Sequence, residues 1–360
     1  PYRTDLTPLP STLRRHCLAR DRLHLWRPSK SRLDNAVGIK LSETDLDRIL
    51  HVINVSWAQG TRDVYGAGLL VFHVFCDLRQ IPEDERCPAS PLLIITFISS
   101  CAGSYAGTTL GNYVFAIKAW HVLHGAIWSM NDAEIKATLT GATILAPPAS
   151  KRPKRAPVTI NLMEQIFAKL NLEDPFDAAV GSCFSTTFYT VARTGEFTVP
   201  SLNAFVSSSH VKPSDVSTRT DRNNLEVTVF RLPKTKCAAQ GEDIFWSEKN
   251  GTTDPKASLA NHLRINSPPE NGHLFAYRHG KGHRSLTKRA FLDRIQTIAV
   301  SIGEDNLKGH GIRIGATLEY LLRGVPFDVV KSLGRWASEA FVLYLRQHAV
   351  IIVPYIQNHP

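Results

Sequence analysis

The residues best suited to chemistry lie near the C-terminus, in Gly309-His310-Gly311-Ile312-Arg313. A histidine and an arginine three residues apart share one face of a helix. An indole N–H donor, Trp336, and a phenol, Tyr344, follow at short spacings. Imidazole, guanidinium and indole groups all donate hydrogen bonds that phosphate oxygens accept. The arrangement suggests the hypothesis that Tyr344 attacks a DNA phosphate held by His310, Arg313 and residues far upstream.

Two upstream segments supply candidate partners for that phosphate. Arg193 can bind a phosphate with its planar guanidinium, and Glu196, three residues later, can hold this arginine or cap a neighbouring helix. Pro233-Lys234-Thr235-Lys236 is expected to form a turn or loop that presents two ammonium groups. Taken alone, the Arg-x-x-Glu pattern is nearly uninformative and favours a surface ion pair. The ordered series of residues therefore carries the argument.

Each C-terminal candidate also has an ordinary interpretation. Tyr344 has apolar neighbours and fits the buried face of an amphipathic helix. Trp336 fits packing in a core. His310 lies near the start of a predicted helix and could cap it.

The elements that must position these residues are a mixture of helices and strands. Asp174-Pro175 and Asp254-Pro255 are typical helix starts, because the aspartate caps the helix and proline is tolerated in its first turn. β-branched alternation predicts the strands. The sequence predicts helices at 159–170, 175–189, from 255, 286–302, 309–322, 326–333 and 338–353, and strands at 225–232, 243–246 and 273–277.

The preceding part of the chain is expected to be a separate helical domain. Ser42 and Asp45 form a candidate capping box ahead of an apolar stripe. Further helices are expected at 61–78, from Pro91, at 108–124, and after Asn131 or Asp132. Residues 1–40 show little periodicity, and residues 1–32 carry eight Lys/Arg against two Asp. We expect a mostly irregular basic arm, either a solvated tail or a DNA contact.

A proline-rich basic stretch separates the two parts, because repeated prolines exclude a continuous helix. It is compatible with nuclear localisation, with a linker that follows phosphates, and with a solvated connector. Its basic residues are Lys151, Arg152, Lys154 and Arg155. The predicted organisation is a basic arm at 1–40, a helical domain at 41–146, a linker at 147–157 and a catalytic domain at 158–360.

Composition limits the class of protein. The 42 Lys+Arg against 32 Asp+Glu give a net charge of +10, which favours a polyanionic partner. The six cysteines have no zinc-site spacing, so we expect reduced thiols inside a cell. The longest apolar run, Leu92–Ile98, is too short to span a bilayer, so the sequence predicts a soluble protein without a membrane partner. We expect no metal or other cofactor.

The whole series resembles the tyrosine recombinase (phage integrase, Cre-like) family, whose catalytic set is Arg, Lys, His-x-x-Arg, His or Trp, and Tyr in this order. The segments 309–316 and 334–336 are especially similar to Cre and to recombinases of eukaryotic mobile elements such as Cryptons and DIRS-type transposons. The resemblance covers roughly 175–350. Tyr344 lies eight residues after Trp336, whereas bacterial members usually have nine; the rival nucleophiles Tyr320 and Tyr355 do not have this spacing.

The resemblance implies a fold that is mainly α with a small β-sheet, a helical SAM-like core-binding domain followed by the tyrosine recombinase catalytic domain. It implies a catalytic set of Arg193, Lys236, His310, Arg313, Trp336 and Tyr344, with Glu196 and Lys234 in support. Lys236 is favoured over Lys234 as the general acid for the 5′-hydroxyl leaving group. Basic residues that we expect on the DNA backbone are those of the linker together with Arg278, Lys281, Arg284 and Lys288.

The implied function is DNA strand cleavage and rejoining through a 3′-phosphotyrosyl intermediate, as in transposon-type recombination or integration. Double-stranded DNA is the expected partner, and recombination would require a synapse of about four copies. We expect a nuclear protein in a eukaryote, and otherwise an intracellular protein located with DNA. Two alternatives stay open: a DNA-binding relative that has lost catalysis, and a relaxing enzyme resembling type IB topoisomerases.

Overall fold

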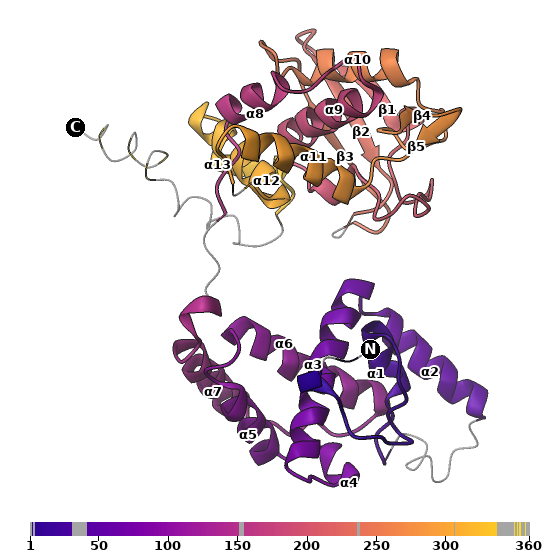
Figure 1. Cartoon of the computed structure of the whole chain (residues 1–360), viewed down its shortest axis with the longest axis vertical. Helices are drawn as coiled ribbons and strands as arrows, with labels where there is room; N and C mark the ends of the chain where they lie inside the picture. Colours follow the sequence, from indigo (N-terminus) through magenta and orange to yellow (C-terminus); the bar gives the residue numbers. More distant parts are fainter. Residues whose placement is uncertain are drawn as a thin grey trace. The chain divides into compact units, whose positions relative to one another are not determined.

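The computed structural model describes residues 2, 4–30, 42–150, 155–235, 238–305 and 307–336, and positions 349, 351, 353 and 357. The chain divides into two compact units, Pro1–Pro153 and Lys154–Pro360 (Figure 1). The boundary between them lies inside the linker predicted at 147–157. Among the helices in the described part of the chain, none combines the length and apolar character that a bilayer-spanning segment needs.

The first unit is helical. Ser42 accepts a hydrogen bond from the Asp45 N–H, and the predicted capping box is confirmed. Ser90 caps the helix that begins at Pro91, and Asn131, one of the two residues expected there, caps the helix that begins at Asp132. The helices are α1 (Ala19–Leu25), α2 (Glu43–Val55), α3 (Gln59–Leu78), α4 (Glu83–Arg86), α5 (Pro91–Cys101), α6 (Gly107–His124) and α7 (Asp132–Ile144).

The described part of the arm predicted at 1–40 is mostly irregular apart from α1, but α1 and Trp26 are not part of a solvated tail. Trp26 is fully buried, and its carbonyl accepts a hydrogen bond from the Trp120 Nε1–H at 2.6 Å. Arg22 is buried too and donates to the Gly66 carbonyl at 2.9 Å. A Cβ on Gly66 would lie 1.7 Å from the Ala19 carbonyl oxygen, so the glycine permits the close approach of α1 to α3. Segment 31–41 lies outside the described residues.

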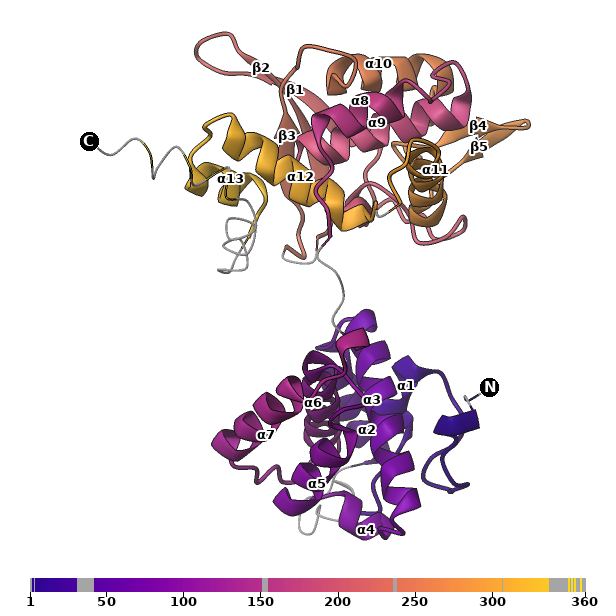
Figure 2. The same ribbon diagram turned by 60° about the vertical axis from the view of Figure 1, so that its left-hand side comes forward.

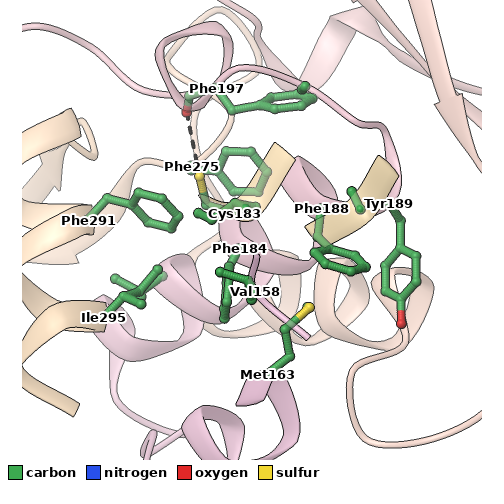
Figure 3. Close-up of a cluster of buried hydrophobic side chains, with 14 of the residues drawn as sticks. Val158, Met163, Cys183, Phe184, Phe188, Tyr189, Phe197, Phe275, Phe291 and Ile295 are labelled. Atoms are coloured by element: carbon green, nitrogen blue, oxygen red, sulfur yellow. Dashed lines mark hydrogen bonds between the residues drawn. The ribbon is translucent and has the colours of Figure 1, made fainter. Parts of the chain in front are cut away.

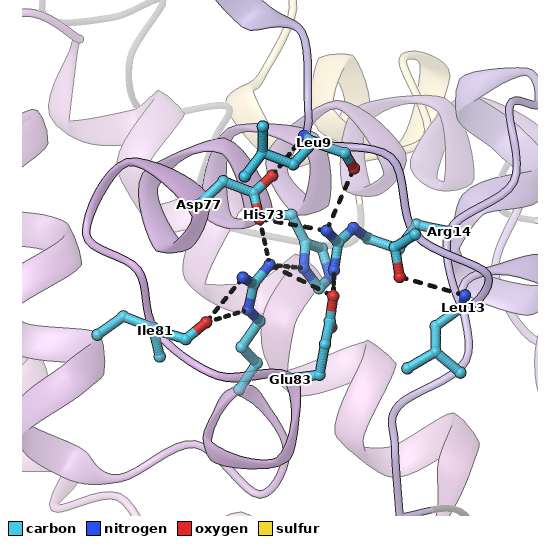
Figure 4. A network of polar contacts seen from close by, with 9 residues as sticks. Leu9, Leu13, Arg14, His73, Asp77, Ile81 and Glu83 are labelled. Carbon is cyan, nitrogen blue, oxygen red and sulfur yellow. Dashed lines mark hydrogen bonds and ion pairs between the residues drawn. The ribbon is translucent and has the colours of Figure 1, made fainter.

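A buried charge network also fastens the N-terminal segment to this unit (Figure 4). Asp77 forms ion pairs with Arg14 at 3.2 Å and with Arg86 at 2.7 Å, and Glu83 pairs with both arginines. His73 is enclosed beside them, and burial lowers its pKa well below the ordinary value. The charge of Arg14, one of the basic residues of the predicted arm, is therefore neutralised inside the first unit.

The second unit is built around one helix, α9 (Pro175–Tyr189), which lies between α10 and α12 (Figure 2). From Asp177 to Tyr189 every residue of α9 is buried, which explains its lack of a polar face. The other helices of the unit are α8 (Ile160–Phe167), α10 (Pro255–Asn266), α11 (Lys288–Ser301), α12 (Gly309–Leu322) and α13 (Phe327–Leu333).

The core of the second unit packs aromatic rings from several elements around α9 (Figure 3). Phe184 stacks on Phe167 of α8 and meets Phe291 of α11 edge to face. Cys183 donates to the Phe197 carbonyl at 3.8 Å. This packing fixes the segment that leaves α9 and carries Arg193.

The strands form two antiparallel sheets, with order β1-β2-β3 and β4-β5. The predictions for β2 (Glu226–Leu232) and β3 (Glu242–Trp246) are confirmed. β1 (Val216–Thr220) was missed because its residues are mostly exposed and show no apolar alternation. The predicted strand at 273–277 was wrong: residues 273–276 are buried in succession, and the strand begins at Tyr277. β4 (Tyr277–His279) and β5 (Gly282–Arg284) pair as a hairpin that carries Arg278, Lys281 and Arg284, three of the residues expected on the DNA backbone.

The fold class is as predicted. The described chain is mainly α-helical, with a small antiparallel sheet in the second unit. All other predicted helices before residue 334 are present, with shifts of a few residues at their ends. The helix predicted at 338–353 lies outside the described residues apart from isolated positions.

Candidate active site

A cavity of about 590 Å³ in the second unit gathers most of the described site candidates. Its lining includes five Lys/Arg side chains against one glutamate. These basic groups come from the segment before α8, the turn after α9, the loop after β2, and the starts of α11 and α12. They are Arg155, Arg193, Lys234, Lys288 and Arg313, and they surround His310. Such a concentration of positive charge suits an anion.

Arg193 is held by a strained turn after α9. Val191 has a φ of 51°, a left-handed conformation that is rare for a β-branched residue. Strain of this kind costs about 1–3 kcal/mol and often accompanies functional sites. The turn directs the Val191 carbonyl to the Arg313 guanidinium at 3.1 Å. It also starts the 3₁₀ turn Thr194–Glu196, in which Arg193 Nη1 donates to Glu196 Oε1 at 3.0 Å.

His310 occupies the first turn of α12 and is exposed at the cavity. The helix cap is Lys308, so His310 does not cap the helix. Partial desolvation beside the cavity wall, with the positive charges of Arg155, Arg313 and Arg193, lowers the pKa of His310. The imidazole is therefore neutral near pH 7 before an anion binds.

Two glycines of α12 bring the end of the linker to the cavity. A Cβ on Gly311 would lie 2.6 Å from the Ala156 carbonyl oxygen, and one on Gly315 would lie 1.8 Å from the Val158 carbonyl oxygen. Only glycine allows this crossing. The Val158 N–H donates to the Gly311 carbonyl at 3.0 Å. The crossing fixes the chain directly after Arg155, which explains why this residue lines the cavity.

Arg313 is 2% exposed and is held on three sides. It donates to the carbonyls of Val191 and Gly334, and its Cζ lies 4.3 Å from the centre of the Trp336 ring. A guanidinium on an aromatic face at this distance is a cation–π contact. Trp336 thus packs its ring against the Arg313 guanidinium, which agrees with the packing role considered for it from the sequence.

Sequence reasoning missed Arg335 and Glu242. Arg335 donates to Glu196 at 2.7 Å and to Glu242 at 2.8 Å. Burial would raise the pKa of Glu196, but the Arg335 charge and hydrogen bonds from Arg335 and Arg193 outweigh it and hold the pKa below its ordinary value. The two carboxylates lie 139 and 93 residues before Arg335, and no local pattern indicates such pairs.

Some predicted site residues lie outside the described part of the chain or away from the cavity. Lys236, Tyr344, Lys151, Arg152 and Lys154 belong to the first group. Arg278, Lys281 and Arg284 belong to the second, on the exposed β4–β5 hairpin.

The rival nucleophile Tyr320 is unsuited to attack. Its hydroxyl donates to the Tyr189 carbonyl at 2.8 Å. Burial raises its pKa, which disfavours the phenolate.

Among the described residues, no group of three or more His, Cys, Asp and Glu side chains is placed to hold a metal ion. The carboxylates near the cavity, Glu196 and Glu242, are both engaged by arginine.

Solved structures with a similar fold include two complexes of XerH site-specific recombinase with difH DNA. The post-cleavage complex matches with a TM-score of 0.56 at 13% identity, over 95% of this chain and 93% of that chain. The pre-cleavage complex matches with a TM-score of 0.53 at 13% identity and the same coverage. Neither a protein-family model nor a curated protein sequence matches this chain. The chain therefore has the tyrosine recombinase fold.

Proposed function

We propose that this protein cleaves and rejoins DNA strands through a covalent link between a tyrosine and a DNA 3′-phosphate. The observation that carries the proposal is the convergence of Arg193, His310 and Arg313 with two lysines on one cavity. These residues come from distant parts of the sequence, and guanidinium, imidazole and ammonium groups are suited to bind a phosphodiester and to transfer protons. The similarity in fold to a site-specific recombinase supports the same class of reaction.

In the proposed mechanism the two arginines bind the non-bridging oxygens of the scissile phosphate. Negative charge grows on these oxygens as the phosphorus becomes pentacoordinate, so preorganised guanidinium groups favour the transition state over the ground state. Arg313 is suited to this role because its contacts with two carbonyls and with Trp336 hold it in place. Arg193 is fixed by Glu196 in the same way.

Proton transfer in this mechanism falls to His310 and a lysine of the turn after β2. A free phenol has a pKa near 10, so attack by Tyr344 needs a proton acceptor or nearby positive charge. The lowered pKa of His310 leaves it neutral and able to accept that proton. Lys236, with Lys234 as its alternative, supplies a proton to the departing 5′-oxygen. Trp336 has only an N–H donor and transfers no proton.

We further propose a biological setting for the reaction. The resemblance to mobile-element recombinases favours transposon-type integration or excision by a synapse of about four copies on DNA. The basic stretch 151–155 is compatible with nuclear import and with contact to the DNA backbone. The hairpin residues Arg278, Lys281 and Arg284 are exposed and are proposed as further backbone contacts.

The test uses nicked suicide duplexes drawn from a pool with a randomised central sequence. Wild-type protein should form a covalent protein–DNA adduct that survives denaturation, and Tyr344→Phe should form none. Tyr320→Phe is the matched control, because it removes a phenol that the fold holds away from reaction. It should retain the adduct.

The outcomes separate the alternatives. DNA binding without any adduct in the wild-type protein would refute the enzymatic proposal and favour a binding protein. Relaxation of supercoiled DNA without exchanged or inverted products would instead favour a topoisomerase-like activity.

A further inference from the structure

Arg335 adopts a backbone conformation that its residue type disfavours. Its φ is 56°, at the point where α13 ends and just before Trp336. The side chain is only 10% exposed. A left-handed, nearly buried arginine is unfavourable unless the surrounding contacts compensate. The contacts of the Arg335 side chain therefore show which interactions this backbone conformation makes possible.

The guanidinium of Arg335 joins two carboxylates that serve different parts of the site. Nη2 donates to Glu196 Oε2 at 2.7 Å, and Nη1 donates to Glu242 Oε1 at 2.8 Å. Glu196 also holds the backbone N–H and the guanidinium of Arg193. Glu242 accepts from the Thr235 hydroxyl at 2.6 Å, and Thr235 lies between Lys234 and Lys236 in the sequence. One side chain thus connects the anion-binding arginine with the lysine turn.

We propose that Arg335 is a positioning residue that assembles these two parts and leaves the charge of Arg193 available to the phosphate. The proposal rests on the proposed function. Two guanidinium groups face two carboxylates in this cluster, so the charges balance. Without Arg335, the cluster would hold two carboxylates, Glu196 and Glu242, against the single guanidinium of Arg193. Its net negative charge would weaken the binding of an anion. Loss of the Glu242 contact would also release the lysine turn.

The affected chemical step is cleavage of the P–O5′ bond. The bond from Tyr344 Oη to phosphorus forms as the P–O5′ bond breaks; the tyrosine hydroxyl proton goes to His310, and the lysine ammonium gives its proton to O5′. A lysine turn that is no longer held would slow protonation of this oxygen. It would matter little for a 5′-sulfur, because a thiolate departs without a proton.

The first experiment measures anion binding independently of cleavage, with inorganic phosphate as the probe. Phosphate should raise the pKa of His310, measured by NMR, because it offsets the nearby arginine charges. Arg335→Met should bind phosphate roughly ten-fold more weakly, and Arg335→Lys should be intermediate because an ammonium cannot fork between two carboxylates. Arg219→Met should match wild type; this arginine pairs with Asp243, and its side chain is 61% exposed.

A charge-restoring variant distinguishes positioning from mere support of the fold. Arg335→Met combined with Glu242→Gln removes one charge of each sign, so phosphate affinity should return to within about two-fold of wild type. A structural role predicts that the double variant is at least as impaired as the single one. Equal phosphate binding by wild type, Arg335→Met and Arg219→Met would overturn the proposal.

The second experiment uses those suicide duplexes that react with wild-type protein. Glu242→Gln should bind phosphate at least as tightly as wild type, because it removes a negative charge from the cluster, but should form adduct about ten-fold more slowly with the 5′-oxygen leaving group. A 5′-sulfur leaving group should restore its rate. Equal slowing with oxygen and sulfur would overturn the link to the lysine turn. Absence of any wild-type adduct would instead overturn the proposed function, while the phosphate measurements would still decide the role of Arg335.

Discussion

Substitution of Gly315 by alanine tests whether the crossing of residues 156–158 over α12 holds the site together. In a helix interior alanine is favoured over glycine by about 1 kcal/mol. Here the new Cβ would lie 1.8 Å from the Val158 carbonyl oxygen, and real contacts stay above 3.0 Å. The backbone at Val158 must therefore move away from α12.

The expected magnitude follows from what that movement breaks. The Val158 N–H would lose its 3.0 Å hydrogen bond to Gly311, at a cost of about 1 kcal/mol. Val158 is 1% exposed, and loosening its side chain costs up to about 1.5–3 kcal/mol. After the gain in helix propensity, Gly315→Ala should destabilise the second unit by about 1.5–3 kcal/mol. Displacement of Arg155 should also weaken phosphate binding.

Hydrogen exchange followed by mass spectrometry measures this effect separately in each unit. The matched control is Gly111→Ala in α6, where no atom lies within 4 Å of the added Cβ. The control should stabilise its own unit by about 0.5–1 kcal/mol. If the amides of α12 exchange as slowly in Gly315→Ala as in the wild-type protein, the crossing is not tightly packed and the reasoning fails.

Two further predictions concern buried charge. His121 accepts a hydrogen bond from the Ala89 N–H at 2.9 Å, and burial lowers its pKa to about 4. The histidine of the unfolded chain takes up a proton near pH 6.5, so the folded state loses stability as the pH falls from 6.5 towards 4. The expected loss in the free energy of unfolding is about 2 kcal/mol at pH 5 relative to pH 7. Denaturant titration at both pH values should show this loss in wild type and a smaller one in His121→Gln; equal losses would contradict it. Arg294→Met breaks a 2.7 Å pair with Asp177, which is 6% exposed, and should cost about 2–3 kcal/mol after allowance for the partly exposed arginine. Arg289→Met on the same helix breaks an exposed pair and should change stability by less than about 0.5 kcal/mol in the same titration; similar values for the two would refute the role of burial.

Local chemistry explains why much of the fold could be predicted. Helix starts such as Ser42 with Asp45, Ser90 before Pro91, and Asp174 before Pro175 are set by hydrogen bonds that span three residues or fewer. The errors concern contacts between distant residues. Trp26 is buried because it meets Trp120, 94 residues later. No period or cap in a basic, proline-containing segment indicates such a contact.

The site shows the same division. His310 and Arg313, which line the cavity, could be proposed from type and spacing, and Arg193 from the ordered series that resembles a known family. Arg335 could not, because its role depends on two carboxylates that approach it only in the folded chain. Its positive φ is likewise invisible in the sequence, since arginine rarely adopts it.

The motif at the start of α12 therefore has two faces with different structural roles. His310 and Arg313, three residues apart, face the cavity, whereas Gly311 and Gly315, four residues apart, lie on the opposite side of the helix and receive the segment after Arg155. In the proposed site, the first face can act on an anion together with Arg155 only if the second face keeps that arginine at the cavity. The Gly-His-Gly-x-Arg-x-Gly sequence of this chain therefore helps to position a third basic residue, more than 150 residues upstream, as well as His310 and Arg313.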